Sequence, residues 1–490
     1  GSLDLNRGVM LSALEVMKSD GPWVLPADVD KVNFLTQYTL DLHETQIKTA
    51  LTVYDNNWNS TDQIPQRQVL SGAMGRFGFV DPSLGGDSSR LNMVFEMSND
   101  NYSTGLYLSR YKLNLFGNFT YFQEDPLNGD AHEQVDRRWI YGGHFEFQRE
   151  LTSRINLRAG TDMRSDQIGE VSLHAVENRI RLGLVRQDSV DWLSLGVFSE
   201  LEIDISDKLR SFLGIRLDYS DYNVLANLSD NSGKGSDDIW LPSIGFAYEV
   251  GSFGELYLNW GKGFHSNDVR GATIAFDPLS NYELEPVVLF SGQDGAEVGY
   301  RVERDDDLVL SLAYFWLQSD SELIFAGDSG GTEASDGSER SGLELAVFWE
   351  LNSNWVLDLT GSIVDSKFVA VDAKFDHIPN AHGRVISMGL THAPVLGWNW
   401  SMRVRHFGDA ALVEDDSINY PSTTIVNMGL SYKTDRWTAG VDLFNLADSE
   451  HYDIAYWYSS RLLSEVSPVE DIHFHPVNPR SIRVGLEYRF

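Results

Sequence analysis

Apolar and polar residues alternate along much of the chain with a period of two. In residues 481–490 one face is apolar and the other is charged or small; the apolar residues are Ile482, Val484, Leu486, Tyr488 and Phe490. Successive side chains of a β-strand point to opposite faces, so this pattern predicts a strand between an apolar and a polar environment.

The same alternation recurs in many other segments. Clear examples are residues 213–219, 256–260, 308–316 and 398–405. Aromatic residues gather toward the ends of these segments, and the polar faces carry Arg, Asp, Glu and Gly, which a dry core would not tolerate without partners. No helical segments are available to cover the apolar faces. The pattern predicts an all-β protein, a transmembrane antiparallel β-barrel with a wet lumen.

The connections between these segments alternate in length. Short connections are expected at 204–207, 250–254, 303–307, 351–354, 393–397 and 433–436, and long ones at 220–239, 265–291, 326–338, 366–380, 407–420 and 447–479. Short periplasmic turns opposite long extracellular loops are typical of outer-membrane barrels. Counting with this alternation predicts about twenty strands, the first near residues 8–18 and the last at 480–490.

Composition supports a membrane barrel and excludes several other classes. The 490 residues include 42 Gly, 13 Trp, 20 Tyr and 25 Phe, and they contain no Cys, so disulfides and thiolate metal sites are excluded. No apolar stretch approaches the roughly 18 residues of a membrane helix. The net charge of −34 makes nucleic acid an improbable partner. Residues 1–4 do not begin a signal peptide, so we expect a mature or truncated exported chain.

Several motifs, in order along the chain, resemble the TonB-dependent receptors of bacterial outer membranes. They are the polar run 58–67, the expected strand 115–122, the segment 263–271, Tyr282 to Pro286 followed by 295–301, and Asp442 to Asp448 before the closing strand that ends at Phe490. The resemblance covers essentially the whole chain. It implies an outer-membrane location and active uptake of a scarce, bulky nutrient, with a metal chelate such as a ferric siderophore as the expected ligand.

The resemblance also implies partners and a domain organisation. The expected partners are outer-membrane lipid and lipopolysaccharide, a plug domain, and the TonB complex acting through that plug; no cofactor is expected. Plugged transporters have about 22 strands, two more than we count. We therefore expect residues 1–490 to be the barrel domain, with the plug and the first barrel hairpin outside these residues. A passive porin-like channel and a surface receptor for a protein partner remain alternatives.

One candidate ligand-binding group is the polar segment after an expected strand. His265, Asn267, Asp268 and Arg270 lie at its extracellular end. Their polar groups could hydrogen-bond an anionic ligand, with Arg270 providing a bidentate contact. Alternatively, Asn267 and Asp268 form a turn and Arg270 pairs with carboxylates of the loop.

Aromatic and histidine residues in the last long loop form a second candidate group. Tyr456 and Trp457 could stack on a flat ligand, or they could belong to an interfacial aromatic belt. His473 and His475 are two residues apart, so in an extended segment both imidazoles could approach one metal ion. The alternative is that these histidines simply pack beside Pro476.

An enzyme is not expected. Residues 327–331 fit the Gly-x-Ser-x-Gly pattern, but a nucleophile elbow requires a strand-to-helix turn, and Ser329 lies in a Gly- and Ser-rich loop. The sequence places no base beside Ser329. The arginines on the polar strand faces, Arg216, Arg403, Arg405, Arg483 and Arg489, are expected to have mainly structural roles.

Overall fold

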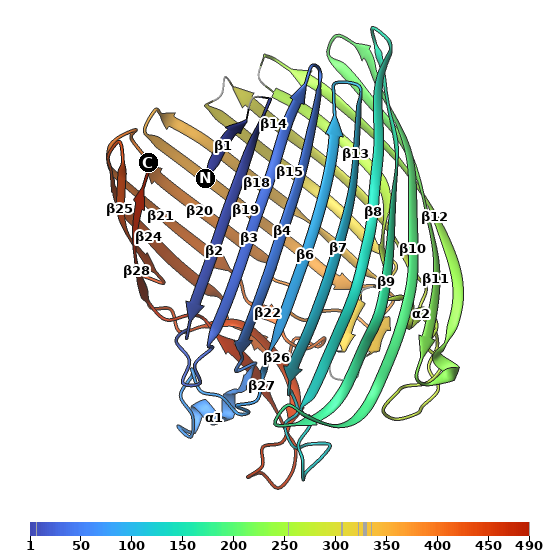
Figure 1. The fold of residues 1–490 in the computed structure, drawn as a ribbon, viewed down its shortest axis with the longest axis vertical. Coiled ribbons are helices and arrows are strands. Elements are labelled where there is room, and N and C mark those ends of the chain that lie inside the picture. Colours follow the sequence, from blue (N-terminus) through green and yellow to red (C-terminus); the bar gives the residue numbers. More distant parts are fainter. Residues whose placement is uncertain are drawn as a thin grey trace.

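The computed structural model describes residues 1–5, 7–252, 254–304, 307–321, 323–326, 331–334 and 336–489. Its main element is one sheet of 21 strands that curves into a barrel wall (Figure 1). Within this sheet each strand pairs antiparallel with the next one along the chain. No helix in the described part of the chain is long and apolar enough to cross a membrane.

The wall strands follow chain order. They are β1 (Ser2–Leu5), β2 (Gly8–Ser19), β3 (Val29–Leu42), β4 (Thr45–Asn59), β6 (Gly85–Ser98), β7 (Tyr102–Gly117), β8 (His132–Thr152), β9 (Ile155–Glu177), β10 (Ile180–Ser206), β11 (Leu209–Ala226), β12 (Gly233–Val250), β13 (Gly254–Ser266), β14 (Phe290–Arg304), β15 (Leu308–Ser319), β18 (Ser338–Asn352), β19 (Trp355–Phe368), β20 (Arg384–His392), β21 (Gly397–Phe407), β24 (Thr423–Lys433), β25 (Trp437–Phe444) and β28 (Ser481–Tyr488). The expected number of about twenty strands is thus confirmed. The sheet also contains β1, a strand of four residues that precedes the first predicted strand.

The remaining elements are short and lie in the connections. They are β5 (Ile64–Pro65), α1 (Gln66–Leu70), η1 (Ser229–Asn231), α2 (Val269–Ala272), β16 (Leu323–Ala326), β17 (Gly331–Ala334), β22 (Ala410–Ala411), β23 (Asn419–Tyr420), β26 (Tyr452–Ser460) and β27 (Val469–Pro476). β26, β27 and β5 form a separate three-stranded sheet.

The period-two pattern sorts side chains between the two faces of the wall, as expected. Large apolar residues such as Leu106 and Trp398 are about 60% exposed on the outer face. The inner face is polar and ion-paired, as where Arg216 contacts Asp162 at 2.9 Å and Asp218 at 2.6 Å. An apolar exterior around a polar interior is the arrangement that a barrel in a bilayer requires.

Short turns lie at one end of the barrel, here the turn end, and the long connections lie at the other, the loop end, together with the two-residue turn between β9 and β10 (Figure 1). All six short connections fall between the strands expected to flank them. The long connection expected at 220–239 is a correction: β11 and β12 extend into it and leave only 227–232 between them. The segment 115–122 is also corrected, since β7 ends at Gly117. Polar strands that continue beyond the apolar belt cannot be distinguished from loops by hydrophobic alternation.

Three neighbouring strands are much longer than a bilayer requires. β8, β9 and β10 have 21, 23 and 27 residues, whereas about 9–11 residues cross the membrane. Their loop-end parts contain β-bulges, one of them at Gly169 between β8 and β9. The β9–β10 hairpin reaches across the loop end, where the Arg179 guanidinium donates to the carbonyl oxygens of Ser83 and Leu84 at 2.6 and 2.8 Å.

The sheet has two edges. One is formed by β1 and by the part of β2 that β1 does not cover, and the other is formed by β28. Among the described residues no backbone pairing joins β28 to β1 or β2. β28 follows a long connection, whereas β1 leads into the short turn before β2, so both strands run toward the turn end. An antiparallel sheet therefore cannot close by pairing these two strands directly.

Candidate functional site

The connection between β13 and β14 folds inward at the loop end and packs on the wall. Val269 and Leu289 are buried there against Ile168, Val190 and Val224. This apolar contact holds α2 inside the barrel, so the polar residues next to it also face the lumen.

Asn267 closes this inward loop. Its side chain is fully buried, its Nδ2 donates to the carbonyl oxygen of Val288 at 2.5 Å, and its backbone N–H donates to the carbonyl oxygen of Leu289 at 2.8 Å. His265 is the second-to-last residue of β13 and is half-buried. Of the four residues singled out in this segment, Asn267 thus has a clear local structural role.

Asp268 and Arg270 form an ion pair at the start of α2. The Asp268 carboxylate accepts the Arg270 backbone N–H at 2.9 Å and the guanidinium Nε and Nη2 at 3.0 and 2.6 Å. Burial opposes ionisation of Asp268, but the charge of Arg270 and these hydrogen bonds outweigh it and lower the pKa of Asp268. The pairing considered as an alternative is therefore present, and its hydrogen bonds use Nε and Nη2 of Arg270 but not Nη1.

Arginines from three separate segments meet beside this ion pair. Arg138 of β8, Arg186 of β10 and Arg270 line one hollow of about 220 Å³, which we call the arginine hollow; its other lining residues include Gln134, Asp136 and Ser172. Each arginine has a carboxylate partner: Arg138 contacts Asp136, and Arg186 contacts Asp188 at 2.5 Å. These partners hold the guanidinium groups in fixed positions.

The long loops form a second structure at the loop end, here called the cap. Its core contains Ile64, Leu412, Tyr420, Ala455 and Phe474, drawn from three connections that are far apart in sequence. β5 and α1 come from the β4–β6 connection, β22 and β23 from the β21–β24 connection, and β26 and β27 from the β25–β28 connection. The cap therefore joins three loops into one packed unit.

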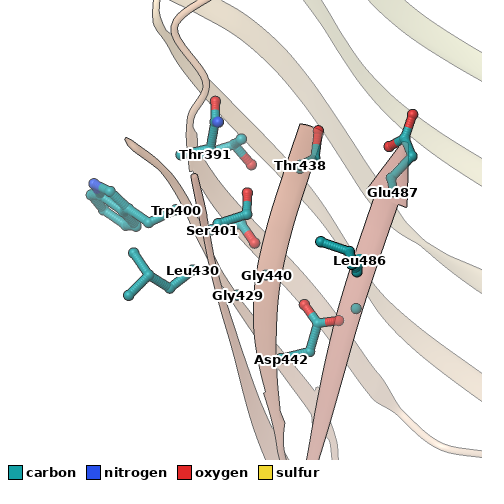
Figure 2. Close-up of a pocket in the computed structure, with 13 residues that line it drawn as sticks. Thr391, Trp400, Ser401, Gly429, Leu430, Thr438, Gly440, Asp442, Leu486 and Glu487 are labelled. Atoms are coloured by element: carbon teal, nitrogen blue, oxygen red, sulfur yellow. The ribbon is translucent and has the colours of Figure 1, made fainter. Parts of the chain in front are cut away.

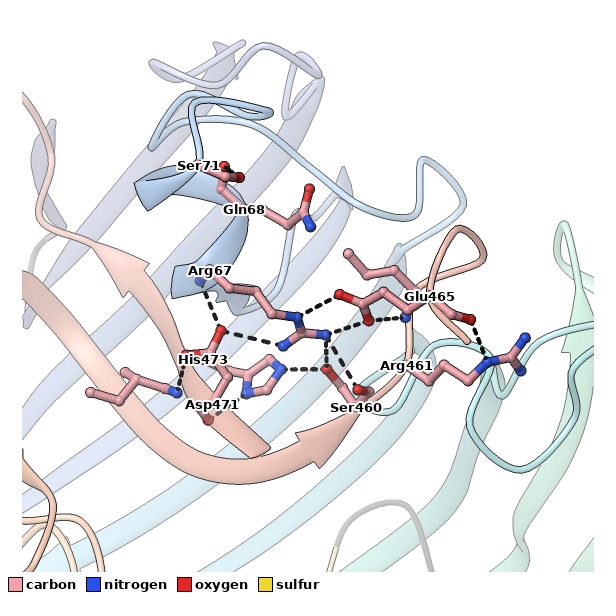
Figure 3. Close-up of polar contacts among 10 residues, drawn as sticks. Arg67, Gln68, Ser71, Ser460, Arg461, Glu465, Asp471 and His473 are labelled. Atoms are coloured by element: carbon pink, nitrogen blue, oxygen red, sulfur yellow. Dashed lines mark hydrogen bonds and ion pairs between the residues drawn. The ribbon is translucent and has the colours of Figure 1, made fainter. Parts of the chain in front are cut away.

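A polar network fixes α1 to the β26–β27 hairpin (Figure 3). The Arg67 guanidinium donates to the Glu465 carboxylate at 2.7 and 2.9 Å, to Asp471 at 3.3 Å and to the Ser460 hydroxyl at 3.0 Å. Burial disfavours the charge of Arg67, but its two carboxylates more than compensate and raise its pKa.

His473 lies at the centre of this network and is completely buried. Its Nε2 is 2.7 Å from the Ser460 hydroxyl, and its Nδ1 is 3.0 Å from the carbonyl oxygen of Asp471. Burial, and then the charge of Arg67, lower the pKa of His473 to about 3. The His475 ring lies tilted against Trp23, with ring centroids 4.6 Å apart. The described residues contain no group of three or more His, Asp or Glu side chains suited to a metal ion, so the metal role of His473 and His475 stays a prediction.

The two aromatic candidates of the last loop lie on β26. Tyr456 pairs in register with His473 and is 39% exposed, whereas Trp457 packs partly buried against the cap core. Tyr456 is thus the more accessible of the two for a ligand. Ser329 lies outside the described residues.

A larger hollow, of about 400 Å³, lies along the wall strands β20, β21, β24, β25 and β28 (Figure 2). Gly429, Gly440 and Gly485 leave the wall bare there, and the charged residues that line it are the acids Asp442 and Glu487. Figure 2 shows Trp400 and Leu430 directed away from Ser401 and Asp442, as strand alternation requires. An acidic, open wall of this kind is a poor site for an anion.

Sequence reasoning did not single out Arg138 or Arg186, although a signal was present. Opposite charges two residues apart occur in four strands, where residues at that spacing share one face, and once more at the start of α2. The series is Asp136–Arg138, Arg164–Asp166, Arg186–Asp188, Arg216–Asp218 and Asp268–Arg270. Each pair is joined by an ion pair in the structure.

A family model described as "TonB dependent receptor-like, beta-barrel" matches residues 24–446. The chain belongs to this family. It is accordingly an outer-membrane β-barrel with short periplasmic turns at the turn end and extracellular loops at the loop end.

Solved receptor structures have the same fold at low sequence identity. The ferric yersiniabactin uptake receptor FyuA from Yersinia pestis is 12% identical with a TM-score of 0.77, covering 100% of this chain and 77% of its own. The ferric citrate transporter FecA is 11% identical with a TM-score of 0.78, covering 100% and 74%. The siderophore receptor PiuA from Acinetobacter baumannii is 12% identical with a TM-score of 0.76, covering 100% and 79%.

Proposed function

We propose that this TonB-dependent barrel imports an anionic metal chelate, such as a ferric siderophore, and that the chelate binds in the arginine hollow. The observation that carries the proposal is the convergence of Arg138, Arg186 and Arg270, from three separate segments, on one hollow at the extracellular end of the lumen. Planar guanidinium groups recognise carboxylates and similar oxygen anions through paired hydrogen bonds.

The ion pairs of the hollow are compatible with a ligand. A guanidinium has five N–H donors, and Arg270 uses Nε and Nη2 for Asp268, which leaves Nη1 for an incoming anion. Because Asp268 already holds the guanidinium in place, little conformational entropy is lost when the ligand binds. The names of FyuA and FecA mention ferric ligands and that of PiuA a siderophore, which supports a metal chelate for this chain.

The proposed transport cycle includes the partners that the family implies. A plug domain occupies the lumen, the TonB complex acts through that plug, and lipopolysaccharide and lipid surround the apolar belt. The alternatives are a passive porin and a surface receptor for a protein.

The test is uptake and binding of radiolabelled ferric chelates by cells that express the full-length receptor. We expect uptake to stop when the proton-motive force is dissipated. The Arg270→Gln variant should bind the chelate about tenfold more weakly, since one charged hydrogen-bonding group is lost. Arg216→Gln, another lumenal arginine but outside the hollow, is the matched control and should bind normally.

Two results would contradict the proposal. Uptake that continues without a proton-motive force would favour the porin. The complete absence of small-solute binding by a folded, surface-exposed receptor would favour a protein partner.

A further inference from the structure

Three basic residues gather on the outer face of the wall, outside the lumen. Arg110 and Lys112 are on β7 and Arg137 is on the neighbouring β8; we call them the outer basic cluster. All three are exposed. In a protein with a net charge of −34, a basic cluster on the surface is a local exception.

The pairing inside this cluster is electrostatically unfavourable. Lys112 stands directly opposite Arg137 in the β7–β8 register, and its neighbour on the other side is Ser89. Like charges directly opposite each other destabilise a sheet. Within the described part of the chain, neither Arg110 nor Lys112 forms an ion pair, and Arg137 pairs with Glu170 at 3.3 Å.

Other outward lysines near the extracellular rim are placed differently. Three of them stand opposite a carboxylate in register and are joined to it by an ion pair: Lys18 to Asp30 at 2.8 Å, Lys262 to Asp294 at 3.6 Å, and Lys367 to Glu339 at 3.3 Å. Lys234, on the part of β12 nearest the loop end, stands opposite Asn223. Among these five lysines, only Lys112 stands directly opposite a second cation.

The cluster lies where the apolar belt ends. Along the outward face of β7, Leu106 and Leu108 are followed by Arg110 and Lys112 toward the extracellular end. On β8 the outward residues change from Phe145 and Tyr141 to Trp139 and Arg137. Such a change from apolar to positively charged side chains is expected where the outer face of the wall reaches the lipid headgroups.

A hollow is present at the same place. It measures about 420 Å³ and is lined by the outer basic cluster together with Trp139, Gln167 and Asp191. The Arg110 guanidinium lies over the Trp139 ring at 5.2 Å, which holds it in position. Asp191 is on β10, three strands from Arg110, so their backbones are roughly 14 Å apart at about 4.8 Å per strand. Gly169, the bulge residue, leaves the floor of the hollow without a side chain.

We propose that the outer basic cluster binds the phosphate of an anionic lipid headgroup in the outer leaflet, with the acyl chains lying along Leu106 and Phe145. A bound phosphate reduces the electrostatic repulsion between Lys112 and Arg137. Because the apolar belt adjoins the cluster, the expected source of this phosphate is a lipid headgroup. This binding is independent of the ligand that the receptor transports.

The experiment is native mass spectrometry of the full-length receptor in detergent, titrated with a bisphosphorylated glycolipid and with its dephosphorylated form. Wild type should retain the phosphorylated form preferentially. Arg110→Gln with Lys112→Gln should weaken that binding about fivefold for each charge removed. The matched control is Lys262→Gln with Lys367→Gln, which removes two outward rim charges and should leave binding unchanged.

Two outcomes would overturn the proposal. One is equal binding by wild type and the cluster variant, or an equal loss in the cluster and control variants, when all three show the same gel mobility of a folded barrel. The other is binding of inorganic phosphate alone by wild type to the same extent as the glycolipid, which would assign the site to free phosphate.

Discussion

At the scale of single residues, His473 illustrates how burial determines a protonation state in the cap. Its imidazole is enclosed between Ser460, the Asp471 carbonyl and the stacked ring of Tyr458, whose centroid is 3.8 Å away. With a pKa of about 3 it is neutral at physiological pH. In an unfolded chain the same group titrates near 6.5.

This difference predicts that the cap weakens in acid. Its contribution is complete above about pH 6.5 and is lost as pH falls toward 3, because the unfolded segment takes up the proton first. Hydrogen exchange of residues 469–476, corrected for intrinsic rates, should therefore show more frequent opening at acidic than at neutral pH. His473→Gln should abolish this dependence between about pH 6.5 and 4.5, above the range in which the Arg67-paired Glu465 takes up a proton, and the exposed control His377→Gln should retain it. The same dependence in both variants over that range would refute the assignment.

At this scale the sequence predicted residue types better than residue roles. It identified Asp268 and Arg270 as a polar pair and left open whether they bind each other or a ligand. The structure shows the mutual ion pair. The sequence could not predict that His473 and His475 would have different surroundings. Those surroundings depend on Arg67 and Trp23, which are far away in the chain.

At the scale of elements, Arg67 makes most of the polar contacts between α1 and the β26–β27 hairpin, beside one hydrogen bond from Gln66 to Tyr452 and the packing of Val69 on the cap core. Arg67 is 17% exposed, and its partners Glu465 and Asp471 are 19% and 13% exposed. Removing one member of a buried ion pair leaves the others without compensation. The stability of the cap should therefore be sensitive to Arg67.

We predict that Arg67→Met destabilises the cap by about 3 kcal/mol while the barrel wall remains intact. Limited proteolysis and hydrogen exchange should show opening of residues 60–84 and 460–472, with unchanged melting of the wall. Arg76→Met is the control, because its partner Glu450 is 81% exposed and such pairs contribute little. An equal effect of both variants would contradict the role given to Arg67.

Strand positions and turn positions were predictable because the alternation continues wherever one face meets hydrocarbon. The cap strands β26 and β27 were not, since their apolar residues pack on other loops and carry no regular period. The extension of β11 and β12 beyond the membrane was missed for a related reason. Polar residues there lie on both faces, and the apolar Val224 packs on the inward loop and gives no regular period.

At the scale of the whole molecule, the edges of the wall determine how the barrel closes. Unpaired backbone groups are costly in a bilayer. Because β1 and β28 run in the same direction, we propose that a strand running the opposite way lies between them in the native barrel. That strand would also bring the wall to the expected number of about 22.

This closure has a direct test in the native protein. Amides throughout β28 should be protected from hydrogen exchange in detergent-solubilised full-length receptor, as they are in a strand with two neighbours. The β24 amides, which lie between β21 and β25, serve as the paired reference. If every second amide of β28 exchanged rapidly while the amides of β24 stayed protected, the edge of the sheet would be open.

The bulge at Gly169 has a consequence for how such a receptor can diversify. Below it the even-numbered residue Ile168 faces the lumen, and above it the odd-numbered Val171 does, so both reach the same apolar cluster. Inserting or deleting one residue there would exchange inward and outward side chains along the projecting hairpin while the membrane wall kept its register. Small changes in length above the bilayer can therefore present new side chains to the environment without a new fold.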